Sequence, residues 1–212
     1  MADQAIQPKS IKQNMMWYSA GSITYLGCQW LLSVVVARMS AGFDDAGALA
    51  LAMAIGNIFT PLAYYNTRTY QVSDVRNEYT DEQYVAFRII TTFLAFVACT
   101  AYAVLTAGLS LAPVVAFLVY KSVVVVIDIL HGVDQRYSRL DYAGVSLIAQ
   151  GVTSLGAFVA VFGLTQNLTA AITGMTVTAV VILLAYDVRH SSRLDSIVPR
   201  ITRGAAKSLA VV

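Results

Sequence analysis

Two charged residues, Lys121 and Asp128, lie inside the apolar segment FLVYKSVVVVIDIL of residues 117–130. A full charge that faces lipid at the bilayer centre costs at least ~2.5–3.5 kcal/mol, so both side chains should face protein or water. On a helix they share one face but lie about 10.5 Å apart along the axis, which is too far for a direct pair. The spacing predicts a charged wall of a hydrated pathway or, alternatively, two separate ion pairs that fix helix packing. Ionisable residues within a membrane favour the pathway.

Polar side chains recur at helical spacing in the other apolar segments. The stripes are Lys121, Asp128, Gly132 and Gln135; Tyr18, Ser22, Tyr25, Gln29 and Ser33; Asn57, Pro61, Tyr64 and Arg68; Ser146, Gln150 and Thr153; and Thr169, Thr173 and Thr176. A single stripe is typical of interhelical hydrogen bonding, worth under ~2 kcal/mol per contact. Several stripes in one bundle indicate a shared polar interior. We predict a substrate pathway lined by Tyr25, Gln29, Asn57, Arg68, Lys121, Asp128 and Gln150.

Two residues beside these stripes have a structural interpretation. Arg88 lies about one turn inside its segment and is predicted to reach toward the interface, near Asp81 or Glu82. Pro61 lacks a backbone donor and should bend the second helix beside Asn57, either as a hinge or as a static kink.

The sequence contains no recognisable catalytic or metal-binding set. Cys28 and Cys99 lie in apolar segments, without a CxxC pair or a Cys/His cluster. His131 and His190 have no carboxylate or cysteine partner at ligand spacing, and no glycine-rich phosphate loop is present. We therefore predict that the chain is not an enzyme and that it uses no cofactor and no metal.

The segments that hold these residues define the class of protein. Of the 212 residues, 58% are hydrophobic and 12% are charged, whereas about 25% of a soluble domain is charged. The apolar residues form blocks of about 20, the length that crosses ~30 Å of hydrocarbon as a helix. Lipid offers the backbone no hydrogen-bond partners, so each block should be helical. We predict an all-α integral membrane bundle of six transmembrane helices, at about residues 16–36, 46–65, 84–105, 109–130, 142–163 and 168–186.

The basic residues predict how this bundle lies in the membrane. All 14 lysines and arginines except Arg38 and Lys121 lie before the first helix, in or beside the second and fourth connections, or after the sixth helix. The positive-inside rule then places both termini in the cytoplasm. Residues 1–190 form the six-helix lobe. The tail 191–212 is polar and turns apolar at its end, which predicts a cytoplasmic linker approaching a missing seventh helix or, alternatively, a tail lying on the membrane surface.

Three segments resemble the polysaccharide flippases of the multidrug/oligosaccharidyl-lipid/polysaccharide (MOP) exporter superfamily. SIKQNMMWYSAGSITYLGCQWLLSVVVAR is similar to the family's first helix, and NTRTYQVSDV to its junction between helices 2 and 3. YKSVVVVIDILHGVDQRYSRLDYAGVSLI resembles its helices 4 and 5, with Lys121, Asp128 and Arg139 in matching places. The family usually has glutamate at the position of Val124 and tyrosine at that of His131.

The resemblance implies one lobe of a two-lobed transporter of the bacterial inner membrane. Such proteins flip lipid-linked oligosaccharides from the inner to the outer leaflet for lipopolysaccharide, capsule or exopolysaccharide synthesis. The expected partners are the lipid bilayer, the lipid-linked saccharide, and either the missing C-terminal lobe or a second copy of the chain. No nucleic-acid partner is expected. Lys121 would attract the anionic pyrophosphate. Two alternatives remain: a drug/cation antiporter of the same superfamily, with Asp128 as its ion-coupling carboxylate, or a non-transporting membrane scaffold.

Overall fold

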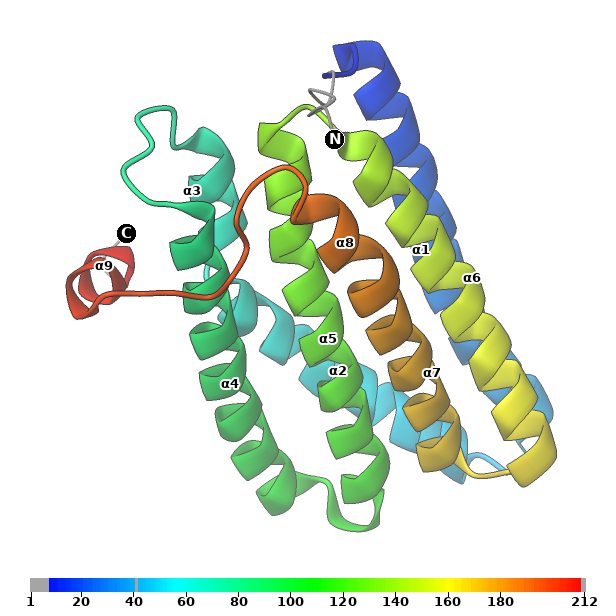
Figure 1. Ribbon diagram of the computed structural model, residues 1–212. Helices are drawn as coiled ribbons and strands as arrows, with labels where there is room; N and C mark the ends of the chain where they lie inside the picture. The colour runs from blue at the N-terminus through cyan, green and yellow to red at the C-terminus, as the bar shows by residue number, and fades with distance from the viewer. Residues whose placement is uncertain (1–7, 41, 211–212) are drawn as a thin grey trace.

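The computed structural model describes residues 8–40 and 42–210, and its elements there are helices and turns (Figure 1). The helices are α1 (Ile11–Met39), α2 (Asp44–Tyr64), α3 (Thr67–Ser73), α4 (Asp81–Thr106), α5 (Leu111–Arg136), α6 (Leu140–Thr165), α7 (Leu168–Ile182), α8 (Val188–Ser191) and α9 (Arg203–Leu209). A 3₁₀ turn, η1 (Gly108–Ser110), precedes α5, and a π-helical turn, η2 (Leu183–Asp187), joins α7 to α8.

Six helical spans are long and apolar enough to cross a membrane. They are Ile11–Met39, Asp44–Ser73, Asp81–Thr106, Leu111–Arg136, Leu140–Thr165 and Leu168–Ser191. The predicted all-α membrane bundle is therefore confirmed. Most spans extend beyond the predicted limits: the second span reaches Ser73 instead of residue 65, and α5 continues from Leu130 to Arg136. The predicted long connection after the second helix is partly wrong, because its first half forms α3.

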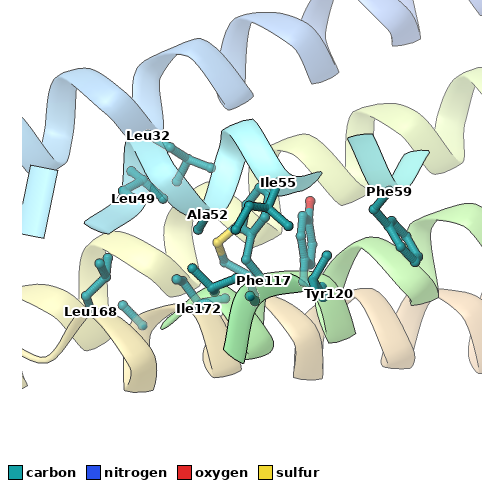
Figure 2. Packing of buried hydrophobic residues seen from close by; sticks show 14 of the residues in the cluster. Leu32, Leu49, Ala52, Ile55, Phe59, Phe117, Tyr120, Leu168 and Ile172 are labelled. Carbon is teal, nitrogen blue, oxygen red and sulfur yellow. The ribbon is translucent and has the colours of Figure 1, made fainter. Parts of the chain in front are cut away.

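The central helix of the bundle is α5, which contacts α2, α3, α4, α6 and α7. Half of the residues in its most apolar stretch are buried, which is the largest share among the six spans. The core lies between α5 and its neighbours, where Leu32, Ala52, Phe117 and Ile172 gather from different helices (Figure 2). Side chains of α5 therefore contact several helices, so a site at the centre of the bundle would include residues of α5.

Helix α1 lies along α6 with unusually close backbones (Figure 1). A Cβ atom on Gly144 would lie 2.4 Å from the carbonyl oxygen of Trp17, and one on Gly21 would lie 2.5 Å from that of Gly144. Small residues allow such approach in membrane bundles, where van der Waals packing is a main source of helix association. These two glycines therefore fix the α1–α6 pair.

The N-terminus of α1, α3, α8 and the C-terminal tail lie at one end of the bundle, which we call the basic end (Figure 1). The tail returns across this end: Tyr137 Oη donates to Asp195 Oδ2 at 2.8 Å, and Tyr65 Oη donates to the Ala210 carbonyl at 2.8 Å. Burial and the hydrogen bond to Asp195 raise the pKa of Tyr137 to about 12. Leu209 of α9 is buried against the start of α4. Whether a seventh helix follows stays a prediction.

Candidate functional site

Three charged side chains from three helices meet near the basic end. Asp128 of α5 lies between Arg68 of α3 and Arg88 of α4. The shortest contacts are 2.7 Å from Arg68 Nη1 to Asp128 Oδ1 and 3.4 Å from Arg88 Nη2 to Asp128 Oδ2. Two guanidinium groups face one carboxylate, so this cluster carries one excess positive charge. We call these three residues the Arg–Asp cluster.

A break in the second span brings Arg68 to this position. Tyr65 and Asn66 both have positive φ, at 40° and 53°, which ends α2 and starts α3 in a new direction. The break follows Pro61, which lies in the last turn of α2. On α5, a Cβ at Gly132 would lie 2.0 Å from Gln71 Oε1. Glycine at this position therefore lets α3 pack directly on α5.

Polar groups from α1 and α5 complete the surroundings of Arg68. Its Nη1 donates to the Tyr18 hydroxyl at 3.3 Å, and its Nη2 donates to Gln135 Oε1 at 2.9 Å. Arg68 thus contacts the predicted stripes of two other helices. Polar side chains of α1, α3 and α5 therefore contact one another at this end of the bundle.

Two adjoining cavities open beside the Arg–Asp cluster. The larger, of about 500 Å³, is lined by Arg68, Arg88 and Asp128 together with Tyr18, Tyr64 and Gln135. The smaller, of about 200 Å³, shares Tyr18, Tyr64, Arg68 and Asp128 and extends to Tyr25, Gln150 and His131. The pair of cavities therefore joins four of the predicted pathway residues: Tyr25, Arg68, Asp128 and Gln150.

Tyr25 and Gln29 meet at a tyrosine that the sequence reasoning missed. Gln29 Nε2 donates to the Tyr120 hydroxyl at 3.1 Å, and the hydroxyls of Tyr25 and Tyr120 lie 3.5 Å apart. Tyr120 is fully buried. The available signal was a hydroxyl-bearing residue directly before Lys121 in an otherwise apolar run.

The remaining predicted pathway residues lie apart from the Arg–Asp cluster. Asn57 is exposed on α2 and lines neither of the two cavities. Lys121 is partly buried, with its ammonium 5.5 Å from the ring centre of Phe117. In the part of the chain that the structure describes, Lys121 makes no ion pair. Gln150, which lines the far part of the smaller cavity, is buried and donates to Ser146 Oγ at 2.9 Å.

One sequence-based interpretation is wrong, and one contact was not predicted. Arg88 does not reach toward Asp81 or Glu82: its side chain is fully buried and also donates to the Ala63 carbonyl at 3.3 Å. Asp81 instead pairs with Arg136 at 2.6 Å. His131 does have a carboxylate partner, because its Nε2 lies 3.4 Å from Asp187 Oδ1. Both contacts join residues far apart in the sequence, which helical spacing within one segment cannot reveal.

Comparisons of the chain with protein-family models, with curated protein sequences and with solved structures found no match.

Proposed function

We propose that this chain is one lobe of a membrane transporter that binds an anionic lipid-linked saccharide and moves it from the inner to the outer leaflet. The observation that carries the proposal is the cationic cavity at the Arg–Asp cluster. Two guanidinium groups against one carboxylate leave one positive charge beside a cavity of about 500 Å³. Guanidinium forks match phosphate oxygens, which makes such a cavity suited to a pyrophosphate.

The charge balance also separates this function from cation transport. A drug/cation antiporter needs a carboxylate that is free to receive a cation. Asp128 already accepts from both Arg68 and Arg88. Lys121 adds a further cation on α5, one turn from Val124 in the wall of the smaller cavity. The excess of positive charge favours an anionic substrate.

The proposed orientation in the membrane rests on the basic residues at one end of the bundle. Positive residues concentrate on the cytoplasmic side of bacterial membrane proteins. The start of α1, the end of α5 and α8 lie at the basic end (Figure 1), and the last two of these contain Arg136 and Arg189. In this proposal the basic end faces the cytoplasm of a bacterium, both termini are cytoplasmic, and the cavity meets its substrate from the inner leaflet. The resemblance of the helix sequences to polysaccharide flippases supports the same direction of transport.

A binding measurement tests the proposal. The purified chain in nanodiscs is titrated with a polyprenyl diphosphate and, as the uncharged comparison, with the matching polyprenol. We expect the diphosphate to bind and the polyprenol to bind far more weakly. Arg68→Gln should weaken diphosphate binding by about 10-fold or more, since a hydrogen bond to a charged group is worth about 1.5–3 kcal/mol.

Two further variants make the measurement specific. Arg189→Gln removes an exposed cation of the basic end that lines neither cavity, and should leave the affinity unchanged. Lys121→Gln breaks no ion pair in the described part of the chain and should weaken binding without loss of stability. Equal affinity for the diphosphate and the polyprenol would contradict the proposal and favour a scaffold.

A further inference from the structure

A second group of titratable side chains lies between α5 and the end of the sixth span. His131 and Asp134 lie one turn apart on α5, and Asp187 lies at the end of η2. His131 Nε2 is 3.4 Å from Asp187 Oδ1, and Asp134 Oδ1 accepts from Ser191 Oγ at 3.1 Å. His131, Asp134 and Asp187 are each at most 3% exposed. We call these three residues the His–Asp cluster.

The π-helical turn places Asp187 in this cluster. The buried residues of α7 follow the helical period through Met175, Ala179 and Ile182. A regular α-helix would next bury residue 185 or 186. The wider turn at Leu183–Asp187 shifts the register by one residue, so that Asp187 is buried against α5. Single π turns are rare and occur often at functional sites.

The carboxylates of the His–Asp cluster differ from the other buried carboxylates of the basic end. Asp81 is paired with Arg136, and Asp141 with Lys9 and Arg139. Among the described residues, no lysine or arginine pairs with Asp134 or Asp187. His131 is the one basic group within ion-pair distance of Asp187 there.

Charged and titratable groups of the neighbouring helices do not change this balance. From α6, Asp141 adds a negative charge that its own cations offset, and Tyr142 packs against His190. From η2, Tyr186 contributes a hydroxyl and no cation. Across the smaller cavity Arg68 is already engaged by Asp128 and Gln135. Two carboxylates and one imidazole therefore share a buried space without an arginine or lysine partner.

Such a cluster is most stable when its net charge is zero, because an uncompensated charge in a low-dielectric interior is costly. With two carboxylates and one imidazole, zero net charge requires at least one carboxylic acid that holds its proton. Several atoms also lack a hydrogen-bond partner in the described structure, namely His131 Nε2 and both carboxylate oxygens of Asp187. A bound proton would satisfy both the charge and the geometry.

We propose that His131, Asp134 and Asp187 form a proton-binding site that exchanges protons with water in the smaller cavity. His131 lines the smaller cavity beside Asp128 and Gln150, which gives the buried carboxylates a route to water. This site does not depend on which substrate the cavity binds.

Infrared difference spectroscopy of the purified chain in nanodiscs tests the site directly. At a pH of about 6 an ordinary aspartic acid is ionised. We expect the wild-type chain to show at this pH the carbonyl band of a protonated carboxylic acid, shifted in D₂O and lost when the pH is raised. Asp134→Asn and Asp187→Asn should each lose the band, because the remaining carboxylate can then be balanced by a protonated His131.

Asp81→Asn is the matched control, since Asp81 is buried at the same end but paired with Arg136. It should leave the band unchanged. Absence of the band from the wild-type chain at pH about 6 would overturn the proposal without any variant. A band that persists in both asparagine variants would place the proton elsewhere and would also overturn it.

Discussion

The Arg–Asp cluster allows a quantitative prediction for the substitution Asp128→Asn. At an effective dielectric constant of about 20, the Coulomb attraction is about 6 kcal/mol for the 2.7 Å contact with Arg68 and about 5 kcal/mol for the 3.4 Å contact with Arg88. Desolvation offsets much of this. Removal of one partner of a buried pair costs about 3–5 kcal/mol, because the remaining charge is left uncompensated. We expect a loss of this size, since Arg88 is fully buried.

The substitution Arg88→Met should cost less. It leaves Asp128 paired with Arg68, and it keeps an apolar side chain over the ring of Tyr64, whose centre lies 4.9 Å from the Arg88 guanidinium. We expect about 1–3 kcal/mol, mainly from the lost cation–π contact and the lost hydrogen bond to the Ala63 carbonyl, which still accepts from Thr91 Oγ1 at 2.8 Å. The double variant should be at least about 1 kcal/mol more stable than the sum of the single effects predicts, because the fully buried charge of Arg88 is then no longer left without its carboxylate and only the partly exposed Arg68 has lost its partner.

The assay is reversible unfolding in mixed micelles, with helicity followed by circular dichroism. Arg38→Met is the control, because Arg38 is exposed at the end of α1 and makes no ion pair in the described structure; it should change stability by less than about 0.5 kcal/mol. Additive effects of Asp128→Asn and Arg88→Met, within about 0.5 kcal/mol, would refute the reasoning that these side chains form one electrostatic unit.

Three further predictions concern other parts of the molecule. Gly144→Ala should destabilise the chain by about 1–3 kcal/mol in the same unfolding assay, because its Cβ would meet the backbone of α1 at 2.4 Å, whereas Gly156→Ala on the same helix has open space and should be neutral or slightly stabilising. Tyr120→Phe should cost about 0.6–1.7 kcal/mol by thermal unfolding, since it removes the hydroxyl that accepts from α1 at 3.1 Å. Burial raises the pKa of Asp74, but hydrogen bonds from two backbone N–H groups and from the Tyr84 hydroxyl outweigh burial and lower this pKa overall. The ionised Asp74 therefore stabilises the loop at neutral pH. The stabilisation is lost only as the pH falls through the lowered pKa. Proteolysis of residues 74–80 should therefore be constant from pH 7 to about 4 and rise below it, and Asp74→Asn should remove the rise.

The apolar blocks were sufficient to predict the six spans, because lipid leaves the backbone no alternative to helix. Their ends at the basic end could not be predicted in the same way. Helix α5 continues through His131, Gly132 and Asp134, whose polarity suggested a connection. These residues are buried by α3, η2 and α8, so tertiary packing rather than local hydropathy sets the limit of the helix.

Only those parts of the candidate site that lie on a single helix could be predicted from the sequence. The period of α5 correctly placed Asp128, Gly132 and Gln135 on one face, which packs against α3. The partners come from other helices. Arg88 reaches Asp128 across the α4–α5 contact, and Asp187 reaches His131 through a π-helical turn that breaks the period of 3.6 residues. Neither contact can be predicted from a regular helical period.

The Arg–Asp cluster has a further consequence for binding, because Asp128 occupies the guanidinium groups that an anionic substrate would use. Arg68 Nη1 donates to Asp128 Oδ1 at 2.7 Å. A diphosphate must therefore displace this carboxylate or bind beside it, and its affinity is reduced by the contact it replaces. Asp128→Asn should lower the stability of the chain and at the same time tighten binding of a polyprenyl diphosphate, by about 10-fold for each 1.4 kcal/mol of competition removed. The affinity is measured by titrating folded Asp128→Asn protein in nanodiscs with the polyprenyl diphosphate. Weaker binding than in the wild-type chain would mean that Asp128 orients the two arginines for the substrate and does not compete with it.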